Sequence, residues 1–154
     1  MADNNDNFPQ ADNIERIFQI ISITDVNDLK NEAAMTVILN DISGRQVRYY
    51  INAAQFLGVL DKDKCFTQFG NELRNCNLFE QKIKIAQKIM AEPTFSEVYF
   101  TELILGAKLE KDEVVAIMKK NIVLCSDSLY RRRAQTVMRW VEWINSIDEY
   151  HVNN

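Results

Sequence analysis

Residues 45–58 read RQVRYYINAAQFLG and predict a helix that stops at a glycine. Apolar side chains recur along this stretch at helical spacing and are expected to face a core: Val47, Tyr50, Ala54 and Leu57. Gly58 follows the last turn, where glycine commonly ends a helix because it adopts the left-handed backbone conformation without strain. Ser43 is well placed to cap the start of the helix, after a turn at residues 40–44.

The opposite side of this helix carries polar side chains of the kinds that contact nucleic acid. Arginine pairs with guanine, and asparagine or glutamine with adenine, in the major groove of DNA. The candidate DNA-binding residues on this helix are Arg45, Arg48, Tyr49, Asn52 and Gln55. The alternative interpretation is a solvated helix face that binds nothing.

Residues 59–67 follow the glycine and indicate two short extended pieces around a charged turn. This pattern favours a β-hairpin. A helix followed by a hairpin is what a winged helix-turn-helix presents to DNA. Lys62 and Lys64 are able to touch phosphate, but Asp61 and Asp63 offset their charge, so we favour a solvent-exposed turn.

The second half of the chain predicts further helices, the last from about Ser128 to Ser146. A degenerate internal repeat relates its start to the first helix, because aligning Ser43 with Ser126 places Arg48 on Arg131. Arginines near a helix start can bind phosphates with help from free backbone N–H groups. The candidate DNA-binding residues here are Arg131, Arg132, Gln135 and Arg139. The alternative is salt bridging to acids such as Asp127 and Glu142.

The composition favours a mainly α protein of 154 residues, with only 4 Gly and 2 Pro. We expect an arm at residues 1–11 that is disordered or loosely attached, a winged helix-turn-helix at 12–77, and a second helix-turn-helix-like unit at 78–150. The fold class is therefore mainly α with a small β-hairpin, in a tandem winged helix-turn-helix architecture. The net charge of −4 argues against a protein coated in positive charge, although DNA binding needs only one basic face.

Catalytic and membrane signals are weak in this sequence. The one histidine, His151, lies in the tail, and the three cysteines form no metal-ligand spacing. Glu80 and Lys82 fit a short nuclease-like pattern, but they lie on a predicted helix and we discount them. No apolar run approaches the roughly 20 residues that span a bilayer. We expect a cytoplasmic protein that needs no cofactor or metal and has no catalytic activity of its own.

Several segments resemble a helical domain attached to some type II restriction endonucleases. They are residues 45–58, the Phe66-Thr67-x-x-Gly70-x-x-Leu73 element, Pro93-Thr94-Phe95, and the run from Ser128 to Ile144 with Arg131-Arg132-Arg133-Ala134 and Trp140-x-x-Trp143. The resemblance implies a tandem winged-helix module that recognises DNA, in enzymes that usually carry a separate nuclease domain. The DNA contacts named above rest on helix geometry and not on this family.

The sequence therefore predicts a DNA-binding recognition module of a restriction-modification or defence system. Its expected partners are double-stranded DNA and a nuclease domain or subunit, and if it belongs to an enzyme, it is the DNA-recognition domain of a restriction endonuclease. The alternative is a winged-helix adaptor that binds protein, with Trp143 at the interface. Neither the DNA sequence recognised nor the oligomeric state follows from the sequence.

Overall fold

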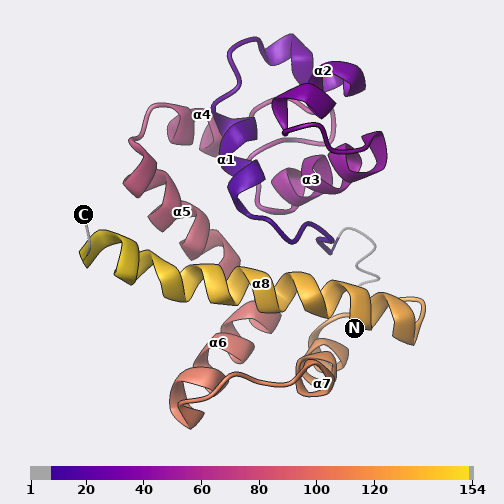
Figure 1. Ribbon diagram of the computed structural model, residues 1–154, viewed down its shortest axis with the longest axis vertical. Helices are drawn as coiled ribbons and strands as arrows, with labels where there is room; N and C mark the ends of the chain where they lie inside the picture. The colour runs from indigo at the N-terminus through magenta and orange to yellow at the C-terminus, as the bar shows by residue number, and fades with distance from the viewer. Residues whose placement is uncertain (1–7, 153–154) are drawn as a thin grey trace.

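The computed structural model describes residues 8–152, with side chains through Ile147. This part of the chain forms eight α-helices and one short 3-10 helix (Figure 1). They are α1 (Glu15–Ile21), the 3-10 helix η1 (Val26–Lys30), α2 (Glu32–Ile38), α3 (Gly44–Phe56), α4 (Gln68–Arg74), α5 (Leu78–Met90), α6 (Pro93–Leu105), α7 (Lys111–Asn121) and α8 (Asp127–Val152). The long helix α8 crosses the middle of the molecule, with α1 to α4 on one side and α6 and α7 on the other.

The mainly α prediction is confirmed, but the predicted β-hairpin is wrong, and the winged part of the architecture is wrong with it. Among the described residues no strand forms, and residues 59–67 contain a single antiparallel bridge between Leu60 and Phe66. The backbone N–H groups of Val59 and Leu60 donate to the carbonyl of Ala54, at 2.9 and 3.3 Å. The segment therefore folds back onto the end of α3, and the side chains of Val59 and Leu60 are buried there. Too few extended residues remain to form a β-ladder.

The tip of the same segment is closed by one carboxylate. Asp61 Oδ1 accepts from the backbone N–H groups of Asp63 and Cys65, at 2.9 and 3.0 Å. An aspartate that bonds the backbone two residues on stabilises a tight turn. The charged residues that suggested a projecting wing therefore form a compact turn.

Around α3 and around α8, a shorter helix, a turn and an arginine-bearing helix follow one another along the chain. Ser43 Oγ accepts from Gln46 N at 3.2 Å, and Gln46 Oε1 accepts from Ser43 N. The two hydrogen bonds form a capping box at the start of α3. At the start of α8, Ser126 Oγ accepts from Leu129 N at 3.3 Å. Helix α2 packs on α3, and α7 packs on α8. Each arginine-bearing helix thus follows a shorter helix and starts at a serine.

The apolar core joins the two predicted units of the chain. Val47, Tyr50, Ala54 and Leu57 are all buried, as the helical periodicity predicts. A row of stacked rings runs from Phe8 to Phe95 and on to Trp140, with centroids 5.5 and 5.3 Å apart. Trp140 Nε1 donates to the carbonyl of Ala11 at 2.8 Å. The rings therefore hold the N-terminal segment, α6 and α8 together.

The N-terminal segment at residues 8–13 connects the groups of helices on the two sides of α8. Residues 1–7 of the predicted arm lie outside the described residues, whereas Phe8 and Ala11 are 2% and 1% exposed. Asn13 N donates to the hydroxyl of Tyr50 on α3 at 3.0 Å. Because the segment also contacts α8, it helps to set how α3 and α8 lie against each other. Among the described helices, none is both long and apolar enough to cross a membrane.

Candidate nucleic-acid interface

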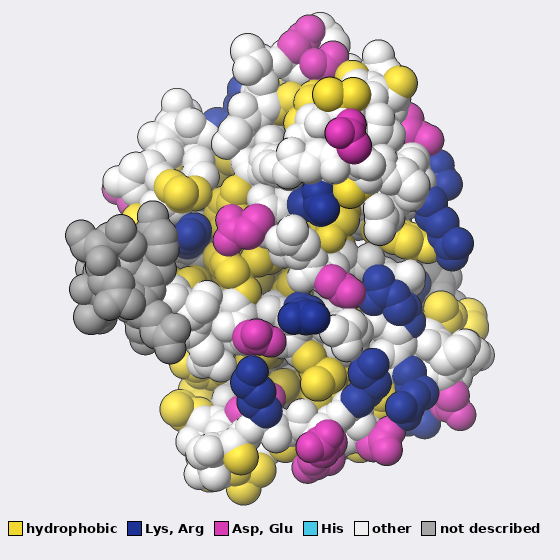
Figure 2. Space-filling model, viewed as in Figure 1, with side chains coloured by type: hydrophobic (Ala, Val, Ile, Leu, Met, Phe, Trp, Pro, Cys, Tyr) yellow, Lys and Arg dark blue, Asp and Glu magenta, His cyan; other side chains and the backbone are white. Residues whose placement is uncertain are grey.

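The start of α3 and the start of α8 open onto one groove of about 820 Å³, called here the two-helix groove. It is lined by Gln10, Ser43, Arg45, Gln46, Tyr49, Ser128, Leu129, Arg132 and Arg133. Within the described part of the chain, this lining contains three arginines and no Asp or Glu. In Figure 2, several Lys and Arg side chains lie on the right of the molecule, with Asp and Glu side chains beside some of them.

Arg45 and Tyr49 form the α3 side of the groove. Arg45 Nε donates to the Tyr49 hydroxyl at 2.6 Å, and the guanidinium carbon lies 5.6 Å from the centroid of the tyrosine ring. This contact uses one of the five N–H donors of the guanidinium. The pair therefore holds Arg45 at the first turn of α3 and leaves donor capacity for an anion.

Arg132 forms the α8 side and is held by the N-terminal segment. Its Nη1 donates to Asp12 Oδ1 at 3.0 Å, and Thr136 Oγ1 donates to the same oxygen at 2.7 Å. The side chains of Arg132 and Asp12 are 42% and 35% exposed, so water screens this ion pair and its contribution to stability is small. Asp12 therefore orients Arg132 and also offsets part of its charge at the edge of the groove.

Two features of the backbone add to the positive character of the groove. The first N–H groups of a helix have no acceptor within the helix, and the helix dipole places partial positive charge there. Both α3 and α8 point this end at the groove, through Ser43 and Ser128. Asp127 is the acidic residue in the first turn of α8, but it pairs with Lys119 of α7 at 3.0 Å. The arrangement suits a phosphate or another oxyanion.

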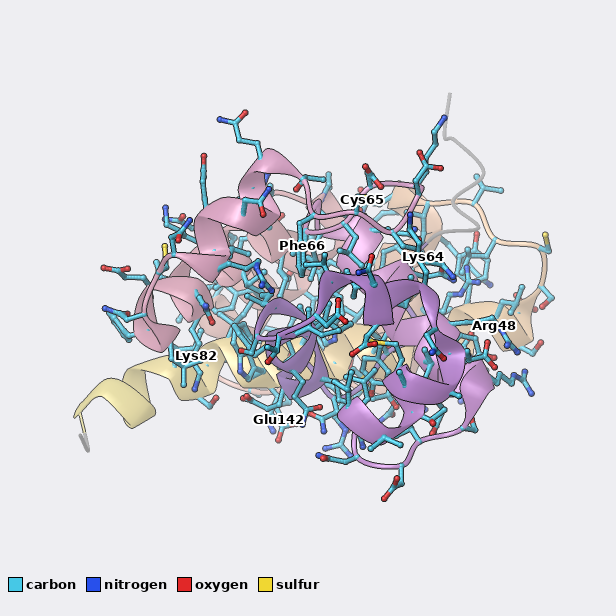
Figure 3. All side chains as sticks on the ribbon, turned by 90° about the horizontal axis from the view of Figure 1, so that it is seen from above. Arg48, Lys64, Cys65, Phe66, Lys82 and Glu142 are labelled. Carbon is cyan, nitrogen blue, oxygen red and sulfur yellow. The ribbon has the colours of Figure 1, made fainter. Side chains whose placement is uncertain are left out.

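The other predicted residues of α3 lie in a second groove. Arg48, Asn52 and Gln55 line a pocket of about 370 Å³ with Lys30, Glu32, Lys64 and apolar side chains of η1 and α3. Arg48 Nη1 lies 3.0 Å from Glu32 Oε2, and Gln55 Nε2 donates to the carbonyl of Asp61 at 3.0 Å. Figure 3 shows Arg48 and Lys64 on the same side of the molecule, far from Lys82 on α5. This groove mixes both signs of charge.

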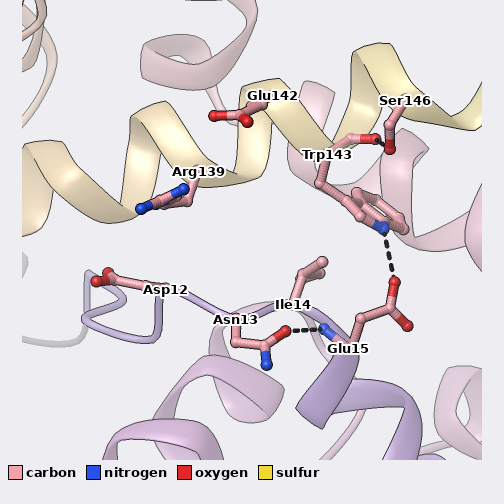
Figure 4. Close-up of a pocket in the computed structure, with 8 residues that line it drawn as sticks. All are labelled: Asp12, Asn13, Ile14, Glu15, Arg139, Glu142, Trp143 and Ser146. Atoms are coloured by element: carbon pink, nitrogen blue, oxygen red, sulfur yellow. Dashed lines mark hydrogen bonds between the residues drawn. The ribbon is translucent and has the colours of Figure 1, made fainter.

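The remaining predicted residues of α8 are spread around the helix. Arg131 pairs with Asp112 at the start of α7, in a pocket lined by residues of α7 and of the first turns of α8. Arg139 lines a separate pocket of about 450 Å³ together with Asp12, Glu15 and Glu142 (Figure 4). Gln135 is half-buried. Of the nine predicted DNA-binding residues, the two-helix groove brings together Arg45, Tyr49 and Arg132.

Trp143 is packed against α1 and does not project from the surface. It is half-buried, and its Nε1 donates to Glu15 Oε1 at 3.3 Å (Figure 4). Its ring centroid lies 5.7 Å from that of Phe18 on α1. The residue proposed from the sequence as the contact of a protein adaptor is therefore engaged within the chain.

The sequence interpretation missed some residues that line the two-helix groove. Arg133 follows directly after two arginines, and a helical wheel cannot say which of three consecutive side chains meets a distant helix. Gln10 belonged to the predicted arm. Ser43 was identified from the sequence as the cap of α3, and in the structure it also lines the groove. The signal in the sequence was the degenerate repeat that aligns Ser43 with Ser126, because it relates the starts of the two helices.

The nuclease-like pattern has a structural explanation. Glu80 lies on α5, where its side chain accepts from Asn77 N at 3.2 Å and completes a capping box. Lys82 on the same helix is buried, with 8% exposed. Within the described residues, no group of three or more His, Cys, Asp and Glu side chains is arranged to hold a metal ion.

The fold and the groove define a class of protein: a mainly helical protein with a cationic groove between two helix starts. The family model described as a domain of unknown function (DUF7226) matches residues 7–149, and the chain belongs to this family. Comparison with curated proteins and with solved structures gives no match.

Proposed function

We propose that this protein is a DNA-binding recognition module and that the two-helix groove holds the phosphate backbone. The observation that carries the proposal is the meeting of Arg45, Arg132 and Arg133 at the starts of two helices, in a lining that holds no Asp or Glu among the residues that the structure describes. Phosphate contacts supply most of the affinity in protein–DNA complexes and are made by arginines and helix N-termini. Double-stranded DNA is the proposed partner.

The proposal differs from the winged-helix form that the sequence suggested. With no wing among the described residues, contact with DNA rests on α3, α8 and the turns before them. The second groove, next to Arg48, Asn52 and Gln55, is the proposed place for contacts to base edges, since these residue types read bases in the major groove. The setting in a cytoplasmic restriction-modification or defence system, with a nuclease domain or subunit as a further partner, rests on the sequence resemblance alone.

The test is binding to fluorescently labelled duplexes of random sequence, measured by anisotropy across a salt series. Wild-type protein should bind, with affinity that falls steeply as salt rises. The double variant Arg45→Ala/Arg132→Ala should bind at least tenfold more weakly and lower the slope of log K against log salt by about 1–2.

The matched control is Arg131→Ala, on the same helix but paired with Asp112 outside the groove. Its affinity should stay within about twofold of wild type, because Arg131 lies outside the groove. Its salt slope should also match wild type, since each lost phosphate contact would change that slope by about 0.9. Absence of salt-sensitive binding by the wild type would refute the proposal. Equal losses in Arg131→Ala and in the double variant would refute the assignment to this groove.

A protein-binding adaptor is the second candidate function. The observation that favours it is the exposed apolar end of α6, where Ile104 is 83% exposed. This surface lies on the opposite side of α8 from α3 (Figure 1). An adaptor would retain its partner when Arg45 and Arg132 are changed, whereas DNA binding would be lost.

A further inference from the structure

The second groove, beside Arg48, has an apolar floor. Leu29 of η1 and Val47 and Ile51 of α3 line it, and they are 2%, 3% and 4% exposed. Val47 and Ile51 stand at i and i+4 on α3, so their side chains are neighbours on one face of the helix. Pockets for small ligands have volumes of about 300–1,000 Å³ and mostly apolar walls. At about 370 Å³, this groove has room for one small organic molecule.

The rim of the second groove is cationic. Lys30, Arg48 and Lys64 are exposed residues of its lining, and Glu32 is the one acidic residue of that lining in the part of the chain that the structure describes. Glu32 pairs with Arg48 at 3.0 Å. Among the described residues, neither Lys30 nor Lys64 makes an ion pair. The two lysines are therefore available to an anionic group.

Hydrogen bonds of the turn at residues 59–67 fix Lys64 beside the groove. The carbonyl of Asp61 accepts from Lys64 N at 3.1 Å and from Gln55 Nε2 of α3 at 3.0 Å, which ties the turn to the helix. Lys64 has a φ of 63°, in the left-handed region that residues other than glycine rarely adopt. Such a conformation persists where surrounding contacts impose it, and it is common at ligand sites. The turn therefore places this lysine before any ligand arrives.

Two side-chain amides of α3 supply hydrogen-bonding groups next to the floor. Asn52 lines the groove and is exposed, and within the described part of the chain its amide makes no hydrogen bond. It therefore offers both a donor and an acceptor. Gln55 uses its Nε2 on the Asp61 carbonyl, and its Oε1 remains an acceptor. Amides of this kind match the edges of nucleobases, above all that of adenine.

We propose that the second groove binds one unpaired nucleotide. The base lies on the apolar floor with its edge at Asn52, and the phosphate lies at Lys30 and Lys64. This inference deepens the proposed function, and it rests on that proposal for the assignment of the second groove to bases. A free nucleotide and an unpaired position in a DNA strand carry the same base and phosphate, so the experiments below separate these two sources.

The hollow shape of the site favours an unpaired nucleotide over a base pair. In a duplex the bases are stacked, and a helix or ribbon that projects into the major groove reads their edges. Asn52 stands instead beside a hollow between η1, α3 and the turn that carries Lys64. A base reaches a buried floor of this kind only after it has left the stack, as in proteins that extrude a nucleotide into a pocket.

The first experiment titrates isotope-labelled full chain with each of the four deoxynucleoside monophosphates, to about 5 mM, and follows the NMR signals. At least one of them should shift the side-chain amide of Asn52 and the backbone amides of Ile51 and Lys64. It should bind at least tenfold more tightly than inorganic phosphate and than the same nucleoside without phosphate, because each of these lacks half of the contacts.

Variants locate the two halves of the site. Lys64→Gln should weaken monophosphate binding at least fivefold. The matched control is Lys62→Gln, which removes the same charge from the same turn but lies outside the lining, and its affinity should stay within twofold of wild type. Asn52→Ala should weaken monophosphate binding and leave inorganic phosphate binding unchanged. Circular dichroism of each variant checks that it is folded.

The second experiment identifies the source of the nucleotide. It compares a fully paired hairpin duplex with the same duplex carrying one extra, unpaired nucleotide. Tighter binding of the second duplex by at least fivefold, lost in Lys64→Gln, assigns the groove to a nucleotide of a strand. Equal binding of the two duplexes, together with binding of a monophosphate, assigns it to a free nucleotide. Either result supports the proposal.

The proposal and the proposed function fail separately. Arg45→Ala/Arg132→Ala should lose duplex binding and keep monophosphate binding, because both arginines lie outside the second groove. A chain that binds a monophosphate but no duplex refutes the proposed function alone.

Three results would overturn the present proposal. One is the absence of any shift at Asn52 and Lys64 with all four monophosphates. Another is a monophosphate that binds no more tightly than inorganic phosphate, which would mean a site for anions alone. The third is an equal loss of affinity in Lys64→Gln and Lys62→Gln.

Discussion

Replacing Trp140 with phenylalanine should destabilise the fold by about 2–4 kcal/mol, since the indole is fully buried and hydrogen-bonded. Loss of the Nε1 donor leaves the Ala11 carbonyl without this bond, which costs about 1–3 kcal/mol. The phenyl ring still stacks on Phe95, but the space of the missing five-membered ring costs about 1 kcal/mol more. For a chain of this size, the midpoint of thermal unfolding should fall by about 5–12 °C.

The assay is urea unfolding followed by circular dichroism, with Trp143→Phe as the matched control. Trp143 is half-buried and its bond to Glu15 is longer, so its replacement should cost under about 1 kcal/mol. The slope of the unfolding free energy against urea should be the same in both variants, since both unfold the same surface. If Trp140→Phe costs no more than Trp143→Phe, the N-terminal segment is not held by this contact, and the reasoning fails.

Two further changes test local features of the fold. Gly70→Ala should destabilise the fold by about 1–3 kcal/mol in spite of alanine's better helix propensity, because the new Cβ would lie 2.2 Å from the Val59 carbonyl oxygen. The control Gly44→Ala should be near neutral, because its Cβ meets only the flexible side chain of Glu32. Equal urea midpoints for the two variants would contradict this account. Burial raises the pKa of Glu92 above 4.5, against the lowering effect of its backbone hydrogen bonds, so its contribution to stability is present below pH 4.5 and is lost as pH rises through the raised value. The melting temperature of Glu92→Gln relative to that of wild type should therefore increase as the pH rises through this range. A difference in melting temperature that does not change with pH would contradict this reasoning.

The helices were largely predictable because their signals are local. The spacing of Val47, Tyr50 and Ala54 and the serine before them fix α3 without reference to the rest of the chain. The turn after Gly58 was not predictable in the same way. Extended residues around a charged turn are compatible with a β-hairpin. The segment instead folds back onto α3, because the backbone N–H groups of Val59 and Leu60 donate to the carbonyl of Ala54.

The residue types of the candidate site were predictable from the sequence, but the position at which they meet in the fold was not. Arg45 and Arg132 were each identified from their helices, yet their meeting depends on how α3 and α8 pack. Arg132 finds its partner Asp12 at a separation of 120 residues, and no local pattern contains such a contact. Arg48, by contrast, pairs with Glu32 in the preceding helix, which a local model of helix-turn-helix packing could have anticipated.

The triple arginine of α8 is divided between two surfaces, and this explains why the full run cannot act as a single DNA-reading face. Consecutive residues are rotated by about 100° around a helix, so they point in different directions. Arg131 meets Asp112 on α7, whereas Arg132 and Arg133 both line the two-helix groove, and Arg132 also pairs with Asp12 of the N-terminal segment. The segment that orients Arg132 also accepts hydrogen bonds from Thr136 and Trp140 on the same face of α8, so the contacts that pack the core also hold this segment against α8. If the two-helix groove binds DNA as proposed, release of residues 8–13 from α8 should weaken that binding, because Asp12 of this segment orients Arg132.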